Sequence, residues 1–516
     1  MSNLEKLTIY DIIQEALQHM PQMPKTVSPL LAMLVYLTIW ICILSLMPKT
    51  EVLGIQILAI AASLVIFCMS LDLLYFYDKT RMGSQFNWSL PLLPEYGIDF
   101  SLGLDGNSFC FLLLTTFIIP LCLLACNSVK VESRKQFILL ILLLELFLIA
   151  SFITRNLFFF FVFFESVVIP MYILMGVYGA RERKIHAVKL FFLYTLAGSF
   201  AFFFALLYIF KYFSSFEYDV LTEVILSPLD QMLLFPLFFI AFAVKVPIVP
   251  FHIWLPEAHV EAPTIGSVIL ASLLLKLGGY GMLRCAVAMC PWGCVYYQGL
   301  INALCVISII YASLAIFAQS DLKRMIAYSS VAHMNLAMLG LFADTQQGME
   351  GAIYLMITHG VVSAGLFFCI GVIYDRGHTR DIKHYSGLVQ VMPLFCLFFF
   401  IFNLANMGFP GTSNFVGELL ILSGLFENNP FVMVFAATGI VLSAAYAIWI
   451  FNRLAFGTKK KAEENVAEYA DLNRVEFYIL LILVIAVILL GVYSSWVTGL
   501  AGLAVKKILS NKFRKR

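Results

Sequence analysis

Apolar segments of about 20 residues, the length that a helix needs to cross the hydrocarbon core of a bilayer, follow one another along almost the whole chain. A soluble fold is excluded, because 61% of the 516 residues are hydrophobic and only 12% are charged, against about 25% in soluble domains. The sequence therefore predicts an all-α membrane protein with about 14 transmembrane helices. The predicted spans cover residues 29–47, 53–77, 108–126, 136–153, 157–179, 187–212, 231–255, 263–288, 297–318, 325–343, 350–374, 390–427, 430–455 and 476–498.

Prolines and glycines interrupt spans 7 and 12. Span 7 contains Pro247 and Pro250, and span 12 contains Gly408, Pro410 and Gly411. Proline removes a helical hydrogen bond, and broken helices are tolerated at membrane depth only where protein or water satisfies the freed groups. Breaks at corresponding positions of two halves predict an inverted repeat of five-helix units. The predicted segments are an amphipathic extension (1–28), spans 1–3 (29–130), the first repeat with spans 4–8 (131–290), the second with spans 9–13 (291–455), and a basic loop, span 14 and tail (456–516).

The short loops carry opposite charges on the two sides of the predicted bundle. Loops after odd-numbered spans are basic, with Lys130, Arg134, Lys135, Arg181, Arg183, Lys184, Lys323, Arg324, Arg376, Arg380, Lys383, Arg453 and residues 459–461. Loops after even-numbered spans are acidic, with Glu217, Asp219, Glu223, Asp230, Asp344 and Glu350. Basic loops remain on the matrix or cytoplasmic side, so both termini are expected on the opposite side. The basic tail, residues 506–516, does not follow this rule.

Four charged residues and two histidines interrupt apolar spans, well away from the loops. A charge at the bilayer centre costs about 2.5–3.5 kcal/mol on insertion scales, so such residues normally face a bundle interior and pair. One interpretation is that they are structural ion pairs and core histidines; the other is a proton relay, which four costly charges of both signs favour. The candidates are Glu165, Lys245, Lys276, His333, His359 and Glu418. Glu145, in span 4, is a further carboxyl that is expected to be buried.

A buried Glu–Lys pair can move protons by changes in pKa. Burial alone lowers the pKa of a lysine and raises that of a glutamate, while an opposite charge nearby reverses both shifts. Separating such a pair therefore lets the lysine release its proton. One pKa unit corresponds to about 1.36 kcal/mol, and moving one charge against 100 mV costs about 2.3 kcal/mol. A shift of a few units is thus large enough to drive transport.

No motif for a redox group or a nucleotide stands out, so no cofactor or metal is expected in this chain. The 11 cysteines are scattered through apolar runs without the spacing of a zinc or redox site. The energy for transport must then come from partner subunits. The N-terminal segment resembles neither a secretory signal nor a transit peptide, since it is acidic and lacks an early apolar run. The chain is expected to be bacterial or made inside an organelle.

Several motifs resemble the antiporter-like proton-channel subunits of respiratory complex I, over roughly residues 100–450. They are Phe163–Ser166 with Ile169–Met171, Lys189–Thr195, Lys245–Thr264 with its prolines and histidines, Leu275–Leu277, and Tyr328–Ser330 with His333. The resemblance implies a multi-pass protein of the mitochondrial inner membrane, or alternatively of a bacterial inner membrane. It also implies lipids, sister antiporter-like subunits and other membrane-arm subunits as partners. NADH oxidation and quinone reduction would occur elsewhere in the complex, with no NADH, quinone or nucleic-acid site here.

The same resemblance implies a role for each candidate. Glu165 would pair with Lys245, Lys276 would be the central relay residue, and the two histidines would continue a hydrated path. Glu418 would be a carboxylate at the exit or between subunits. The sequence departs from the family pattern at three places, none of which is a candidate relay residue. Aspartate is frequent in the family near Asn156, where Arg155 is the neighbour here, and at Glu257, and segment 1–28 is longer than expected.

Two other functions fit the same buried charges. A subunit of a multisubunit Na+/H+ antiporter would use them equally well, but Glu418 favours complex I, since the antiporter subunits and the sister channel subunits usually carry lysine there. A structural subunit that only couples its neighbours is the other alternative. Co-purification with quinone-reducing partners would distinguish a complex I subunit from an antiporter subunit. Removing the charge at Lys276 would distinguish a proton relay from a structural subunit, since a structural subunit should pump normally without it.

Overall fold

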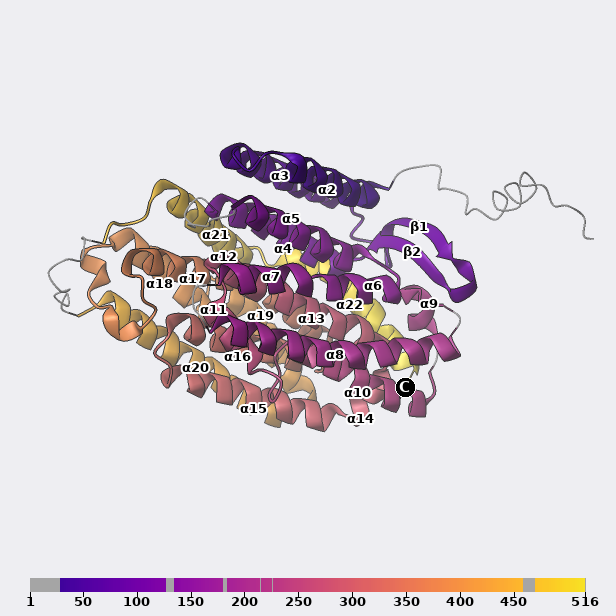
Figure 1. Ribbon diagram of the computed structural model, residues 1–516. Helices are drawn as coiled ribbons and strands as arrows, with labels where there is room; N and C mark the ends of the chain where they lie inside the picture. The colour runs from indigo at the N-terminus through magenta and orange to yellow at the C-terminus, as the bar shows by residue number, and fades with distance from the viewer. Residues whose placement is uncertain are drawn as a thin grey trace, which may run out of the picture.

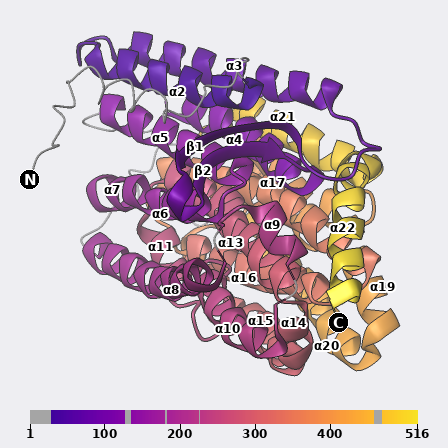
Figure 2. The same ribbon diagram turned by 90° about the vertical axis from the view of Figure 1, so that its right-hand side faces the viewer.

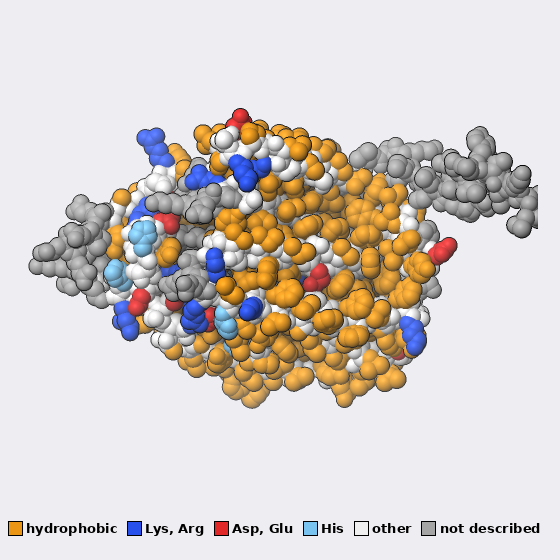
Figure 3. All heavy atoms as spheres, viewed as in Figure 1, with side chains coloured by type: hydrophobic (Ala, Val, Ile, Leu, Met, Phe, Trp, Pro, Cys, Tyr) orange, Lys and Arg blue, Asp and Glu red, His pale blue; other side chains and the backbone are white. Residues whose placement is uncertain are grey.

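The computed structural model describes residues 28–126, 134–179, 183–213, 215–224, 226–457 and 469–515, and most of this part is helical. The long helices run side by side, with α2 and α3 as a separate layer along one side of the bundle (Figure 1). Hydrophobic side chains cover most of the face seen in Figure 3, while Lys, Arg and His side chains gather at the end near α18. The predicted extension 1–28 lies outside the described residues, except for Ser28.

The helices of the first half, in chain order, are α2 (Pro29–Leu46), α3 (Val52–Phe76), α4 (Gly106–Ala125), α5 (Arg134–Ile153), α6 (Leu157–Ser166), α7 (Val168–Tyr178), α8 (Lys184–Tyr212), α9 (Tyr218–Glu223), α10 (Pro228–Lys245) and α11 (Trp254–Glu261). A fully buried central helix follows over residues 264–287. It consists of α12 (Thr264–Ile269), the π-helical turn η2 (Leu270–Leu274), α13 (Leu275–Gly281) and the π-helical turn η3 (Met282–Val287).

The second half begins with α14 (Pro291–Tyr296) and continues with α15 (Gln298–Phe317), α16 (Leu322–Leu341), α17 (Gln346–Gly377), α18 (Pro393–Asn406), α19 (Ser413–Asn428), α20 (Pro430–Ala455), α21 (Arg474–Val492) and α22 (Ser495–Lys515). Short 3-10 turns are η1 (Pro94–Tyr96), η4 (Ile382–His384) and η5 (Leu388–Gln390).

Twelve helices in the described part of the chain are long and apolar enough to cross a membrane, so the predicted count of about 14 is not confirmed. The two predicted spans that do not qualify are the tenth and the twelfth. The tenth is α16, a 20-residue helix whose apolar character is reduced by buried polar side chains such as His333 and Asn335. The twelfth is divided into α18 and α19, which have 14 and 16 residues.

Both predicted helix breaks are present. Span 7 divides into α10, which ends at Lys245, and α11, which begins at Trp254. Span 12 divides between Asn406 and Ser413. In this second break Gly408 and Gly411 have φ angles of +71° and +89°, a region that residues with a Cβ rarely enter. The breaks thus place Lys245 at a helix C-terminus and Glu418 in the second turn of a new helix.

A β-hairpin forms within the predicted loop 78–107, where no strands were expected. Strand β1 (Gln85–Leu93) pairs antiparallel with β2 (Ile98–Leu104), and a bridge from Leu102 to Thr154 attaches the hairpin to the connection between α5 and α6. A hairpin satisfies most of its own backbone hydrogen bonds. It lies at the end of the bundle opposite the basic loops, beside α9 (Figure 1).

The basic tail, which does not follow the loop-charge rule, forms α22. This helix crosses the end face that also carries the β-hairpin (Figure 2). Lys507 Nζ lies 3.9 Å from Asp219 Oδ1, and Lys512 forms a buried ion pair with Asp344. Both partners belong to the predicted acidic loops. The tail is therefore basic because it packs on the acidic face, with lysines that neutralise the aspartates there.

Candidate functional site

Lys276 lies at the centre of the candidate site, on α13 of the central helix, and is fully buried. Its Nζ donates a hydrogen bond to the carbonyl oxygen of Ala271 at 2.5 Å. The second partner of Nζ is Nδ1 of His359 on α17, at 2.8 Å. A lysine ammonium only donates hydrogen bonds, so when Lys276 is charged His359 Nδ1 must accept and the ring must be neutral. The contact joins a proton donor directly to a titratable acceptor.

His333 continues the line from His359. The two ring centroids are 5.5 Å apart, close enough for transfer through one bridging water. On its other side, Nδ1 of His333 lies 3.4 Å from Oε1 of Glu418. This distance is an ion-pair contact when the imidazole is protonated, rather than a short hydrogen bond.

Tyr446 is a further member of this group, which the sequence reasoning missed. It lies on α20, is 1% exposed, and its hydroxyl is 3.3 Å from Nε2 of His333. A hydroxyl can donate or accept, so Tyr446 can satisfy His333 in both protonation states. A small cavity beside this contact is lined by His333, Glu418 and Tyr446, among others. Because tyrosine is common in apolar spans, its position in the sequence carried no signal.

Lys245 and Glu165 form a second group, and they are not in direct contact. Lys245 Nζ donates to the carbonyl oxygen of Phe164 at 2.8 Å and lies 3.2 Å from the centroid of the Phe164 ring. Glu165, the next residue, is half-buried near the end of α6, and its Oε1 has no hydrogen-bond partner among the described residues. The ion pair implied by the resemblance is therefore separated in this structure, with the two charges on neighbouring elements.

A glycine allows the two groups to approach each other. Gly278 lies two residues after Lys276, and a Cβ added there would lie 3.0 Å from the Cβ of Lys245 and 3.1 Å from the backbone nitrogen of Val246. Only a residue without a side chain permits this approach of the span-7 break to the central helix. The charge of Lys245 is thus held beside the helix that carries Lys276.

Glu145 is buried, as expected, but it belongs to a different contact. It is fully inaccessible on α5 and accepts a hydrogen bond of 2.8 Å from Ser63 Oγ on α3. Gln56, also on α3, donates to the carbonyl oxygen of Leu123 on α4 at 3.0 Å. These polar contacts attach the outer helix α3 to α4 and α5. In the described part of the structure, Glu145 forms no hydrogen bond or ion pair with Lys276, His359, His333 or Glu418.

The structure therefore brings four of the six predicted residues into one line: Lys276 on α13, His359 on α17, His333 on α16 and Glu418 on α19. All four are at most 4% exposed. Such a line can transfer a proton from the central helix to a carboxylate on the broken helix. Glu165 and Lys245 lie outside the line, where their charges can act on it through the low-dielectric interior.

Comparison with known proteins gives a consistent set of relatives. The family described as "NADH:quinone oxidoreductase/Mrp antiporter, TM" matches residues 154–443. NADH-ubiquinone oxidoreductase chain 4 of Marchantia polymorpha is 47% identical over 90% of this chain and 92% of its own length. NADH-quinone oxidoreductase subunit M of Rhodobacter capsulatus is 43% identical over 88% of this chain and 90% of its own.

Solved structures share the fold. A chain of respiratory complex I from Thermus thermophilus superimposes with a TM-score of 0.83 at 32% identity, covering 93% of this chain and 99% of that one. A chain of the Mrp complex from a Dietzia species gives a TM-score of 0.82 at 18% identity, covering 93% and 97%. At this lower identity the likeness concerns the fold alone.

Proposed function

Because this chain belongs to the NADH:quinone oxidoreductase/Mrp antiporter family of membrane proteins, we propose that its line from Lys276 through His359 and His333 to Glu418 carries protons within the membrane. The chain is a proton-translocating membrane-arm subunit of respiratory complex I, of the type called chain 4 in mitochondria and subunit M in bacteria. It is a multi-pass inner-membrane protein whose partners are other membrane-arm subunits. NADH oxidation and quinone reduction take place elsewhere in the complex.

The observation that carries the relay proposal is the contact between Lys276 Nζ and His359 Nδ1, at 2.8 Å in a fully buried site. A purely structural lysine would be paired with a carboxylate, because burying an unpaired charge is costly. Lys276 instead faces a neutral acceptor that can take its proton. The proton can then pass to His333, where Glu418 stabilises the imidazolium and the hydroxyl of Tyr446 adjusts to the change.

Lys245 and Glu165 supply the control of this transfer. When Lys245 is charged and separated from Glu165, its field acts on Lys276 across the Gly278 contact and favours release of the Lys276 proton. When Lys245 pairs with Glu165, the field is neutralised and Lys276 can be reloaded. The transfer of one charge against 100 mV costs about 2.3 kcal/mol. A change of about two pKa units supplies this energy.

Neutralising Lys245 tests the control step. Complex carrying Lys245→Met, reconstituted in liposomes, should oxidise NADH and lose most of the proton transport that depends on this subunit. The variant also leaves the Phe164 carbonyl without its donor, which costs about 1–3 kcal/mol. The readout is the ratio of protons pumped to NADH oxidised.

Lys245→Arg is the matched control, because arginine retains the positive charge and the donor but does not release a proton. It should keep most of the pumping, since the proposed role of Lys245 is that of a field and not of a carrier. Unchanged pumping in the Met variant would show that Lys245 does not control the relay.

A further inference from the structure

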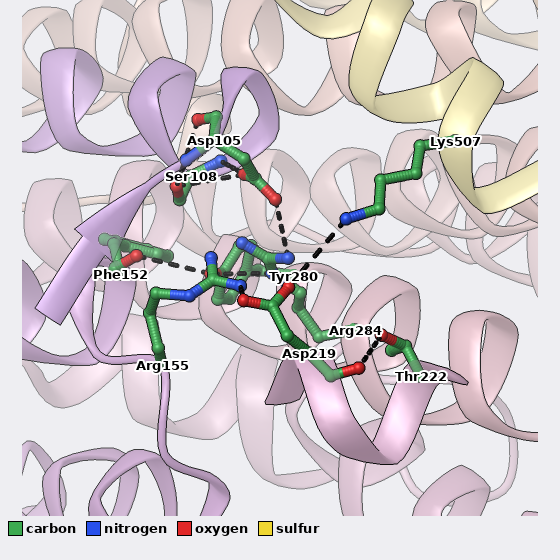
Figure 4. Close-up of polar contacts among 9 residues, drawn as sticks. All are labelled: Asp105, Ser108, Phe152, Arg155, Asp219, Thr222, Tyr280, Arg284 and Lys507. Carbon is green, nitrogen blue, oxygen red and sulfur yellow. Dashed lines mark hydrogen bonds and ion pairs between the residues drawn. The ribbon is translucent and has the colours of Figure 1, made fainter. Parts of the chain in front are cut away.

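A cluster of ion pairs lies at the end of the central helix that faces the β-hairpin and α22 (Figure 4). Arg284 Nη1 lies 2.6 Å from Asp105 Oδ2, and Arg155 Nη2 lies 2.5 Å from Asp219 Oδ2. Lys507 of α22 is at the rim, 3.9 Å from Asp219. Asp105 and the two arginines are at most 8% exposed, whereas the side chain of Asp219 is 45% exposed. The cluster thus extends from a buried interior to the acidic face.

The cluster lies on the same helix as the central relay residue. Lys276, Tyr280 and Arg284 are spaced by four residues and so share one helix face. Arg284 is therefore about 12 Å along the helix from Lys276. A path for protons from Lys276 directly to the acidic face would have to pass Tyr280 and Arg284. Such a path would bypass His359 and would leak protons.

The end of this helix is polar and roomy enough to hold water. Two cavities, of about 20 and about 30 Å³, are lined by Arg155, Tyr218 and Arg284, and a single water needs about 10–15 Å³. Asn156 lines the smaller cavity and is fully buried, and its Nδ2 has no hydrogen-bond partner among the described residues. The larger cavity reaches Asp219 and Lys507. Hydration alone would make this region a route for protons.

The direction of the hydrogen bonds prevents that route. The Tyr280 hydroxyl donates its only proton to the carbonyl oxygen of Phe152, at 3.3 Å, and accepts from Arg284 Nε, at 2.9 Å. A guanidinium has five donors and no acceptor, and it does not deprotonate in proteins. A proton that arrives at Tyr280 therefore has no acceptor beyond it. The ring of Tyr280 also packs against Phe111, Phe152 and Phe160, with centroids 5.3–5.9 Å away.

Asp105 keeps Arg284 in position. It lies just before α4, and burial alone would raise its pKa, but the Arg284 guanidinium and the Ser108 amide hold the pKa of this carboxyl below its usual value. It therefore remains an anion that anchors the guanidinium. The charged groups around the pair are Arg155, Asp219 and Lys507, with Glu217 on the α9 side. Arg284 itself is bonded to the Tyr280 hydroxyl, so it is the first charge that a proton coming from Tyr280 would meet.

We propose that Arg284, anchored by Asp105 and bonded to Tyr280, is a proton barrier that closes the central helix toward the acidic face. Water can occupy the cavities around it, but its fixed positive charge and its lack of an acceptor exclude protons, as an arginine does in water-selective pores. Protons on Lys276 then leave only through His359. This inference rests on the proposed relay and adds the element that gives the relay its direction.

Passive proton leak in the absence of NADH tests the barrier. Complex in liposomes is given a potassium diffusion potential with valinomycin, and a trapped dye reports internal pH. The double variant Arg284→Met with Asp105→Asn removes both charges of the pair, so it leaves no unpaired buried charge. It should therefore assemble better than Arg284→Met alone. The leak should rise by about tenfold or more, as when one modest electrostatic barrier is removed. A variant with Arg284→Gln and Asp105→Asn, whose neutral side chains can bond each other, should leak similarly.

Two controls separate a barrier from a structural role. Arg284→Lys keeps a cation with donors only, and the neighbouring Asp105 carboxylate favours its charged form. Lys507→Met removes a charge at the rim. Both variants should remain as tight as the unmodified complex. A leak in Arg284→Lys would contradict the barrier, as would an assembled neutral variant of either kind that does not leak.

Adding Lys276→Ala to the leaking variant separates this inference from the relay itself. If the leak disappears, protons pass from the opened end of the helix to Lys276, as the barrier and the relay together require. If the leak persists, the path that Arg284 blocks does not include Lys276, and the barrier proposed here for the central helix is contradicted. The relay is then judged separately, by the protons pumped per NADH oxidised in Lys276→Ala alone.

Discussion

Replacing His359 with Leu should give a complex that still oxidises NADH but has lost the proton transport that depends on this subunit. Among the described residues, His359 Nδ1 is the only side-chain hydrogen-bond partner of Lys276 Nζ, and the His359 ring lies 5.5 Å from that of His333. Leucine breaks the line at this point. It also leaves a buried lysine with only the Ala271 carbonyl as a partner, and an unpaired buried charge costs about 3–5 kcal/mol. The measurement is the number of protons pumped per NADH oxidised, together with the thermal stability of the purified complex.

His359→Gln separates these two effects. The amide oxygen of glutamine can accept a hydrogen bond from Lys276, so stability should be largely kept. Glutamine does not titrate in the physiological range, however, so transport should be lost as fully as with leucine. If His359→Gln pumps normally, His359 is a structural partner of Lys276 and not a proton carrier.

Gly408→Ala is the second change with a large expected effect. Gly408 has a φ angle of +71°, and a Cβ there would lie 2.2 Å from Oε2 of Glu418. The left-handed conformation costs a residue with a Cβ about 1–2 kcal/mol. The larger effect should be on function, since the methyl group displaces the Glu418 carboxylate from His333. We expect pumping to fall sharply while the complex remains assembled.

Gly411→Ala is the control for backbone strain. Gly411 has a φ angle of +89°, but nothing lies within 4 Å of an added Cβ. This variant should lose about the same 1–2 kcal/mol of stability and keep its pumping. Adding Glu418→Asp to Gly408→Ala shortens the acid by one methylene and should restore part of the transport. Equal pumping in the two alanine variants would show that the carboxylate position is unimportant.

The sequence predicted most of what depends on local pattern. Apolar length located the spans, and the prolines and glycines of residues 247–250 and 408–411 located the two broken helices. The cost of a buried charge selected Lys276 and Glu418 before their neighbours were known. These inferences are reliable because the bilayer imposes the same requirement on every residue of a span. The sequence did not predict that Lys276, His359, His333 and Glu418 form one line. That arrangement depends on how distant helices pack together, and the hydrophobic periodicity of a single segment carries no information on such packing.

Other features could not be predicted for identifiable physical reasons. The β-hairpin lies outside the lipid, where apolar length is not required. The basic tail broke the loop-charge rule because its lysines pair with Asp219 and Asp344 of the acidic face. Arg284 could have been found, since it interrupts an apolar run as Lys276 does. Its meaning depends on Asp105, almost 180 residues earlier in the chain, and a contact between such distant residues has no signature in one sequence.

Lys276→Ala tests the central claim most directly. Complex that carries this change should be purified intact, reconstituted in liposomes and assayed for protons pumped per NADH oxidised. The line from Lys276 to Glu418 predicts a reduced ratio with NADH oxidation maintained, since the proton carrier at the centre of the membrane is missing. A normal ratio in the assembled variant would contradict the relay, and the buried charges of this subunit would then serve only to hold its helices together.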